Sequence, residues 1–202
     1  MANCCCTDYA LEGPKTDLEA IKKAIESVKE ERYGLSRIHR VLEAVGVGVP
    51  DVDVREDITG VKWSEDGKSL LVQAESSWNP KLDAWREIRK KFPHVKVFFQ
   101  TEEFGNDVFY SNDTQRKHFK GTVALDWAIG NDGDLQYFKD GDELVKWTNE
   151  KFQKEFGTFD EARTYLENDW VEESIDEDAF ASIHILEYDD FDLLDEIEEE
   201  GE

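Results

Sequence analysis

Residues 58–74 read ITGVKWSEDGKSLLVQA, and the architecture expected for this chain of 202 residues is built outward from them. Residues 58–63 and 69–74 are rich in apolar and β-branched side chains, and Ser64-Glu65-Asp66-Gly67 lies between them. An Asp-Gly pair between two such runs is a strong hairpin signal. The segment therefore predicts two antiparallel strands joined by a tight turn.

A strand and a helix are expected on either side of this hairpin. Upstream, residues 7–11 predict a strand, and the helix after it has an apolar stripe at Leu18, Ile21, Ile25 and Val28. A second helical pattern, at about residues 34–46, is interpreted as an insertion. Downstream, a helix begins near Pro80 and buries Leu82, Trp85, Ile88 and Phe92, and a strand with Val95, Val97 and Phe99 follows.

The order strand, helix, strand, strand, helix, strand is that of a split β-α-β arrangement. We therefore expect an α+β protein in which residues 1–130 form a ferredoxin-like domain, an antiparallel sheet with helices on one face. Residues 131–202 are expected as a C-terminal extension with a helical hairpin, an added strand over 180–188 and an acidic end, packed on the first domain.

Several short motifs carry a family resemblance. They are Met1-Ala2-Asn3 with Cys5, the turn glycine Gly13, Trp78-Asn79-Pro80, Phe92-Pro93, and Glu102-Glu103 followed by Gly105. In these motifs the chain resembles the YubB-type ferredoxin-like domain family of phage, plasmid and bacterial chromosomal genes. The resemblance implies the same fold and a mobile-element setting, and it implies no catalytic residues.

The end of the chain dominates its electrostatics. From Thr164 to Glu202 there are 17 Asp or Glu residues and no Lys or Arg, in a chain of net charge −24. Such a surface repels nucleic acids and anionic membranes and attracts basic protein surfaces, including those of nucleic-acid-binding proteins. The expected partner-binding residues are the last acidic side chains, Glu187, Asp189, Asp190, Asp192, Asp195, Glu196, Glu198, Glu199 and Glu200.

No motif points to a metal, a cofactor or a catalytic residue. The four histidines are scattered, and Cys4, Cys5 and Cys6 are consecutive, which suits half-buried strand thiols better than zinc ligands. No apolar run of membrane-spanning length and no secretory signal is present, so we expect a cytoplasmic location.

Three functions are open on these grounds. The leading one is a non-enzymatic protein-interaction module that binds a basic protein surface, in one version as a nucleic-acid mimic. The second is an enzyme that uses carboxylates for acid and base chemistry, for which Glu102, Glu103 and Asp107 form a local group. The third is a structural domain with a solvating acidic tail.

Overall fold

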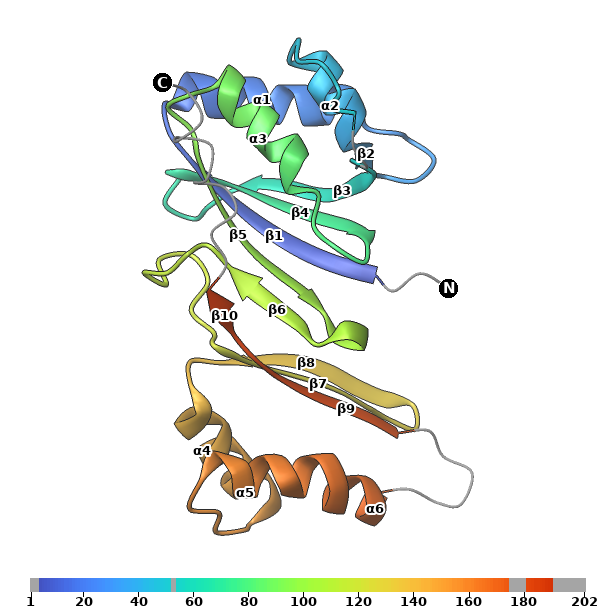
Figure 1. Cartoon of the computed structure of the whole chain (residues 1–202), viewed down its shortest axis with the longest axis vertical. Coiled ribbons are helices and arrows are strands. Elements are labelled where there is room, and N and C mark those ends of the chain that lie inside the picture. Colours follow the sequence, from blue (N-terminus) through green and yellow to red (C-terminus); the bar gives the residue numbers. More distant parts are fainter. Residues whose placement is uncertain (1–3, 52–53, 175–180, 191–202) are drawn as a thin grey trace.

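The computed structural model describes residues 4–51, 54–174 and 181–190. It is a mixed α+β protein with helices at both ends and two sheets between them (Figure 1). Among the described residues, no helix is both long and apolar enough to cross a membrane.

The first unit contains the elements up to residue 111 together with the short last strand. Its elements are β1 (Cys4–Glu12), α1 (Lys15–Ser27), β2 (Ser36–Arg37), α2 (Ile38–Ala44), β3 (Glu56–Trp63), β4 (Ser69–Ser77), α3 (Leu82–Lys91), β5 (Lys96–Glu103), a 3-10 turn (Phe104–Asn106), β6 (Val108–Ser111) and β10 (Asp189–Asp190). The strands form one sheet in the order β10-β6-β5-β1-β4-β3-β2. All neighbours are antiparallel except β10 and β6, which are parallel.

The core of the first unit lies between this sheet and its three helices. Side chains alternate along a strand, so β1 sends Tyr9 and Leu11 to the helix-covered face, where they meet Trp85 of α3 and Ile21 of α1. Figure 1 shows α1, α2 and α3 together on this face. Among the described residues no helix covers the opposite face of the sheet, and polar side chains of β1, β4 and β5 point to that face.

The second unit is a three-stranded sheet with helices on one face. Its elements are β7 (Val123–Ile129), β8 (Asp132–Phe138), α4 (Gly141–Phe152), α5 (Phe159–Thr164), a π-helical segment (Tyr165–Asp169), α6 (Trp170–Ser174) and β9 (Ala181–Glu187). The strand order is β8-β7-β9, all antiparallel. Alternate residues of β7 divide between two cores: Val123 and Leu125 pack under the helices, and Ala124 faces the first unit.

A small apolar cluster joins the two units. Phe109 of β6 packs with Ala124 of β7 and Leu186 of β9. Tyr188, between β9 and β10, donates its backbone N–H to the Thr122 carbonyl (2.9 Å) and its hydroxyl to the Ser111 carbonyl (2.9 Å). The chain therefore returns from the second sheet to the edge of the first, as Figure 1 shows for β10 beside β6.

The structure confirms a mixed α+β protein with antiparallel sheets, and it groups some segments differently from the sequence analysis. Val123–Ile129 falls before the boundary drawn at residue 130, yet it pairs with β8 and β9, because its alternating apolar residues need a second sheet face to cover them. The inserted helix corresponds to α2, and the strand expected over 180–188 corresponds to β9.

Candidate acidic binding pocket

The pocket depends on the side chains of β1, which alternate between the two faces of the sheet. Cys5, Thr7 and Tyr9 point toward the helices and are buried, so Cys6 and Asp8 point to the face without helices. Cys5 and Thr7 both reach the Thr101 hydroxyl of β5, at 3.1 and 2.8 Å. These buried polar contacts hold the middle of β1 in register against β5.

The antiparallel register then places polar side chains in two rows. Asp8 lies opposite Gln73 of β4 on one side and Gln100 of β5 on the other. Cys6 lies between Glu75 of β4 and Glu102 of β5 in the same way. Directly opposed residues on one face have Cβ atoms about 5 Å apart, so three carboxyl groups gather over three strands.

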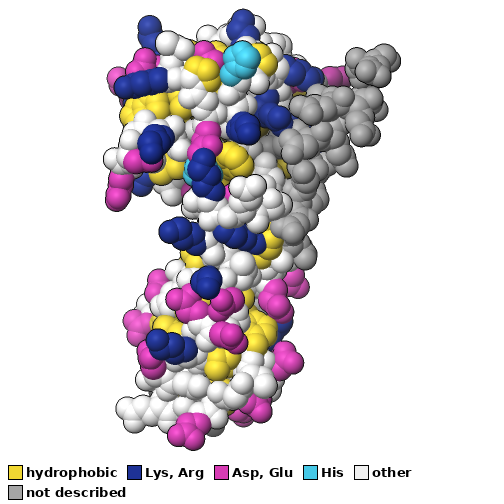
Figure 2. Space-filling view, turned by 90° about the vertical axis from the view of Figure 1, so that its left-hand side faces the viewer, with side chains coloured by type: hydrophobic (Ala, Val, Ile, Leu, Met, Phe, Trp, Pro, Cys, Tyr) yellow, Lys and Arg dark blue, Asp and Glu magenta, His cyan; other side chains and the backbone are white. Residues whose placement is uncertain are grey.

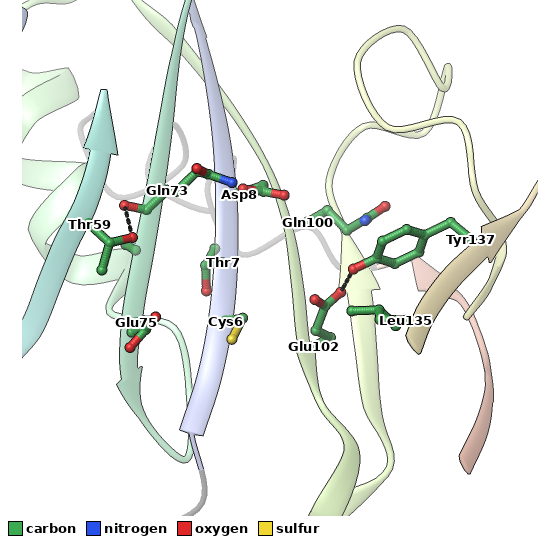
Figure 3. Close-up of a pocket in the computed structure, with 11 residues that line it drawn as sticks. Cys6, Thr7, Asp8, Thr59, Gln73, Glu75, Gln100, Glu102, Leu135 and Tyr137 are labelled. Carbon is green, nitrogen blue, oxygen red and sulfur yellow. Dashed lines mark hydrogen bonds between the residues drawn. The ribbon is translucent and has the colours of Figure 1, made fainter. Parts of the chain in front are cut away.

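Two side chains of β8 cover this face and turn it into a pocket of about 390 Å³. Leu135 and Tyr137 approach from the second sheet, and the Tyr137 hydroxyl donates a hydrogen bond to Glu102 (Figure 3). On the far side, Thr59 at the β3 bulge donates its hydroxyl to the Gln73 carbonyl at 3.3 Å. The pocket is thus shared by both units, and its wall depends on how they are joined.

Two carboxyl groups of the pocket, those of Glu102 and Asp8, are destabilised in their charged form. Burial raises the pKa of Glu102 to about 7, the hydrogen bond from Tyr137 opposes that rise, and the charges of Asp8 and Asp126 add to it. Burial also raises the pKa of Asp8, against a hydrogen bond from Gln73 and the charge of Lys62. A cationic group entering the pocket would relieve this repulsion, since an opposite charge favours the ionised carboxylate.

The charge of Lys62 acts on Asp8, but no described cationic side chain pairs closely with the carboxyl groups of the pocket. No Lys, Arg or His nitrogen of the described chain forms an ion pair within 4.0 Å of Asp8, Glu75 or Glu102. A neighbouring pocket shares Glu75 but adds Arg37 and Arg55, so the acidic character is strongest at the Asp8 and Glu102 end.

The cysteines do not form a reactive centre. Partial desolvation, with the nearby Cys4, Glu102 and Glu75, raises the pKa of Cys6 to about 12, and burial raises the pKa of Cys5. The thiolate is the nucleophile and the metal ligand, so these thiols are poor in both roles. Within the described part of the chain, no group of three or more His, Cys, Asp or Glu side chains has a geometry that could hold a metal ion.

Of the acidic residues expected at the C-terminus, Glu187 has a described side chain, and it does not line this pocket. Glu187 ends β9 on the helix-covered side of the second sheet, where Arg163 Nη1 lies 3.6 Å from its carboxylate. Asp189 and Asp190 form β10 through their backbones, opposite Tyr110 and Ser111 of β6. The remaining expected residues, Asp192, Asp195, Glu196, Glu198, Glu199 and Glu200, lie outside the described residues.

The carboxylate group expected at Glu102, Glu103 and Asp107 is divided by the sheet. Consecutive strand residues face opposite sides, so Glu102 lies in the pocket while Glu103 is buried on the other face. Glu103 accepts hydrogen bonds from the Gly105 N–H (2.9 Å) and the Asn106 amide, and so caps the 3-10 turn. Asp107 closes that turn in a left-handed conformation, φ 54°. Glu103 and Asp107 therefore have structural roles.

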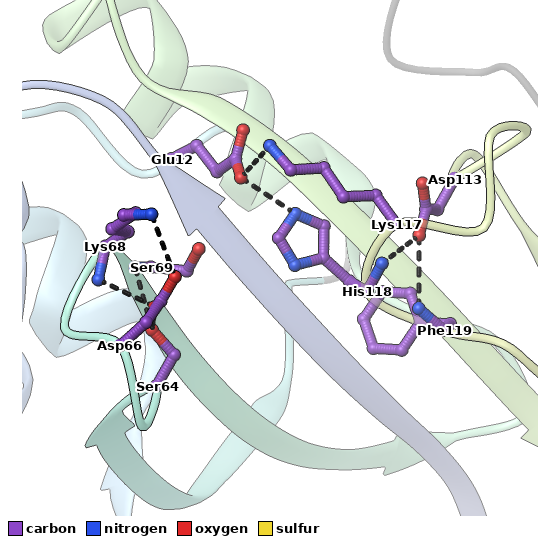
Figure 4. A network of polar contacts seen from close by, with 9 residues as sticks. All are labelled: Glu12, Ser64, Asp66, Lys68, Ser69, Asp113, Lys117, His118 and Phe119. Carbon is purple, nitrogen blue, oxygen red and sulfur yellow. Dashed lines mark hydrogen bonds and ion pairs between the residues drawn. The ribbon is translucent and has the colours of Figure 1, made fainter.

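A second polar network, around Asp113, fixes the segment that links the two units (Figure 4). Asp113 is 1% exposed, and its Oδ2 accepts the backbone N–H groups of His118 (2.6 Å) and Phe119 (3.1 Å). Lys117 and His118 in turn contact Glu12 at the end of β1, His118 Nε2 at 3.1 Å. These contacts tie the linking segment to β1, which makes the network a structural feature.

The sequence contains a pattern that points to the pocket, but periodicity alone does not distinguish it from other strand patterns. Cys6 with Asp8, Gln73 with Glu75, and Gln100 with Glu102 each place two polar residues at a spacing of two. The polar residues of these three strands form one continuous polar surface only if the strands are adjacent. Their adjacency comes only from the strand order β5-β1-β4.

Comparisons of the chain with models of protein families, with curated proteins and with solved structures give no match. The pocket residues themselves are therefore the basis for assigning a function.

Proposed function

We propose that this protein is a non-enzymatic interaction module that binds a basic protein surface, with the pocket at Asp8 and Glu102 receiving a Lys or Arg side chain of the partner. The observation that carries the proposal is a pocket with three carboxyl groups and no ion pair to a described cationic side chain. Its volume of about 390 Å³ falls in the range of sites that hold a small ligand or one large side chain.

The surface charge supports the same kind of partner. On the face shown in Figure 2, Lys and Arg side chains are spread over the first unit and the junction, and Asp and Glu side chains gather over the second unit. The chain as a whole has net charge −24, which steers a basic partner toward it and disfavours direct contact with nucleic acid. A nucleic-acid-binding protein is one such partner, and the acidic surface would then act as a nucleic-acid mimic.

The proposal also includes a ferredoxin-like fold, a mobile-element origin and a cytoplasmic location. The four strands β5-β1-β4-β3, with α1 after β1 and α3 after β4, support a ferredoxin-like arrangement with β2, β6 and β10 added at its edges. The motifs at Gly13, Trp78-Asn79-Pro80 and Phe92-Pro93 support kinship with the YubB-type family of mobile elements. The free cysteines suit a reducing compartment such as the cytoplasm.

A basic peptide tests the proposal directly. The probe is a labelled arginine-rich peptide, titrated by fluorescence anisotropy into the wild-type chain and into the double variant Asp8→Asn with Glu102→Gln. The double variant is expected to weaken binding at least about tenfold, because partly desolvated charge pairs contribute more than exposed ones. Glu65→Gln, in the exposed turn between β3 and β4, removes one charge far from the pocket and should change affinity less than about twofold.

A further variant separates the pocket from the acidic end of the chain. Neutralising Glu196, Glu198, Glu199 and Glu200 should lower affinity modestly and in a salt-dependent way if these residues only steer the partner. If that variant abolishes binding while the Asp8 and Glu102 variant keeps it, the pocket assignment is wrong and the acidic end is the binding site. If neither variant has an effect, the structural domain with a solvating tail is the better description.

One observation favours the enzymatic alternative. The pKa of Glu102, at about 7, suits a general acid or base near neutral pH, and Asp8 lies in the same pocket. A catalytic Glu102 would give turnover that is lost in Glu102→Gln while the substrate still binds. A binding role gives no turnover in a panel of hydrolase and isomerase substrates, and it loses affinity in the same variant.

A further inference from the structure

Four aromatic rings surround the ammonium group of Lys151 on the second unit. Lys151 Nζ lies 4.6 Å from the ring centre of Trp127, 4.6 Å from Trp147, 4.9 Å from Trp170 and 5.6 Å from Phe152. Cations within about 6 Å of an aromatic ring centre are attracted to its face, and tryptophan attracts them most strongly. The arrangement is that of an aromatic cage already occupied by a side chain of the same molecule.

Three elements distant in the chain build this cage. Trp127 comes from β7, Trp147 and Phe152 from α4, and Trp170 from the start of α6. The π-helical segment Tyr165–Asp169 directly precedes Trp170, whose N–H bonds to the Tyr165 carbonyl. A π turn inserts one extra residue and rotates everything after it by about 100°, and such turns are frequent at functional sites. This rotation brings Trp170 to 5.1 Å from Trp127 and 5.0 Å from Phe152, centre to centre.

Lys151 can leave the cage without breaking an ion pair to a described residue. It lies in the last turn of α4 on an exposed position, and the next residue but one, Gln153, ends the helix in a left-handed conformation. Within the described residues no carboxylate oxygen lies within 4.0 Å of its Nζ, and burial lowers its pKa while the charge of Asp134 opposes that shift. Asp134 is paired with Trp127 across β7 and β8, so a negative charge stands near the cage on the same sheet face.

The cage also has an unused hydrogen-bond donor. The indole N–H of Trp127 is buried and has no hydrogen-bond partner among the described residues. A buried donor without a partner is uncommon in a purely structural cluster, because leaving it unpaired is unfavourable. The unpaired Trp127 donor is therefore a second observation that favours a ligand at this cluster.

From these contacts we propose that the cage of Trp127, Trp147, Phe152 and Trp170 is a binding site for a methylated ammonium group, and that Lys151 is a displaceable internal occupant. Quaternary ammonium groups suit such cages because they keep their charge and lose little hydration on entry. The site is separate from the acidic pocket, since it lies on the helix-covered face of the second sheet.

The test compares wild type with Lys151→Ala, which empties the cage. Tryptophan fluorescence is titrated with choline and with two peptides that differ only in carrying trimethyl-lysine or unmodified lysine. Lys151→Ala is expected to bind choline and the trimethyl-lysine peptide about 2- to 30-fold more tightly than wild type, the range of one displaced cation–π contact. If the trimethyl-lysine peptide binds more tightly than choline, the ligand is assigned to a methylated protein. If the two bind equally tightly, the ligand is assigned to a free methylated amine.

Two matched variants exclude simpler explanations. Lys146→Ala removes the same charge from an exposed position on α4 outside the cage, and it should leave affinity within about twofold of wild type. Lys151→Ala combined with Trp147→Leu should lose the gain in affinity that Lys151→Ala alone gives. Near-UV circular dichroism verifies its folding, because Trp147 is partly buried in the second core.

A nuclear magnetic resonance readout tests displacement in the wild-type chain. Ring currents should shift the ε-methylene protons of Lys151 upfield, and added choline should return them toward ordinary lysine values. The proposal is overturned if Lys151→Ala binds the modified and unmodified peptides equally, if it does not bind choline at millimolar concentration, or if the Lys151 signals do not move in wild type.

Discussion

Glu56 is a carboxyl group buried at the centre of the first core, 2% exposed. Its two oxygens accept hydrogen bonds from the Tyr9 hydroxyl (2.8 Å) and the Trp85 indole N–H (2.9 Å), and the Lys81 backbone N–H lies 3.5 Å from one of them. Burial raises the pKa of Glu56 to about 7, and these hydrogen bonds oppose the rise. A polar network of this kind orients Tyr9 against Trp85, whose ring centres are 4.3 Å apart.

Glu56→Gln should remove a pH dependence of stability. The pKa of Glu56 is raised in the folded state, from 4.5 to about 7, so the stabilisation is complete below pH 4.5 and is lost as the pH rises through 7. Relative to Glu56→Gln, wild type should lose up to about 3 kcal/mol between pH 4.5 and pH 8. Urea denaturation across this range measures the difference. Parallel curves for the two proteins would show that Glu56 does not titrate as described.

Glu102 should make peptide binding pH-dependent. Its pKa is about 7 in the free protein, and only the ionised form attracts a basic side chain. Affinity for the arginine-rich peptide should therefore rise about tenfold from pH 6 to pH 8. Anisotropy titrations at four pH values measure the rise, and Glu102→Gln should flatten it.

Tyr137→Phe provides the matched control for that measurement. The hydrogen bond from Tyr137 lowers the pKa of Glu102, so its removal should move the midpoint of the binding curve to higher pH. A midpoint that does not move in this variant, or a rise that persists in Glu102→Gln, would assign the titration to another group.

At the level of single elements, a side chain continues the hydrogen bonding of the sheet beyond the end of β6. The ladder between β5 and β6 stops at Gln100 and Ser111. Beyond it, the Asn112 side-chain amide accepts the Phe99 N–H (2.8 Å) and donates to the Val97 carbonyl (2.9 Å). One asparagine thus satisfies two backbone groups that a longer strand would otherwise have to pair.

Asn112→Ala should destabilise the protein by about 1–3 kcal/mol, because both backbone groups of β5 lose their partner. Asn131→Ala, in the exposed turn between β7 and β8, is the control and should stay within about 0.5 kcal/mol of wild type. Thermal and urea unfolding measure both variants. Equal stability of Asn112→Ala and wild type would mean that water replaces the amide without loss.

For the whole molecule, the decisive contact is the small cluster between the two units. Phe109 is 2% exposed and packs with Ala124 and Leu186 of the second sheet. The acidic pocket needs this contact, since Tyr137 of β8 can reach Glu102 of β5 only when the sheets are held together. The geometry of the pocket is therefore coupled to the junction.

Phe109→Ala should loosen the two units from each other. Removing a buried phenylalanine costs about 3–5 kcal/mol, here at the junction and outside the two larger cores. Hydrogen exchange in increasing urea should then show β7 amides opening before β1 amides, while in wild type they open together. Val97→Ala, within the first core, is the control. It should destabilise both units, and the β7 and β1 amides should still open together. Simultaneous opening in Phe109→Ala would contradict this role of the junction.

Local patterns in the sequence are enough for much of the fold and for little of the pocket. Alternation, helical stripes and the Asp-Gly turn locate the hairpin of β3 and β4, the helices α1 and α3 and the strand β5, because each depends on neighbouring residues alone. The tryptophans show where such reasoning ends. Trp78 is 47% exposed with φ 69°, whereas Trp170 is 7% exposed, and no local pattern distinguishes the two positions.

Glu102 and Glu103 mark the division most clearly. The sequence places two adjacent carboxylates at a strand end, and the strand period of two sends them to opposite faces. The partners that give Glu102 its chemistry, Asp8 and Tyr137, come from another strand and another sheet. Local sequence thus determined the strands and helices. Register, strand order and sheet stacking assembled the acidic pocket and, separately, the aromatic cage, because they depend on packing between distant residues.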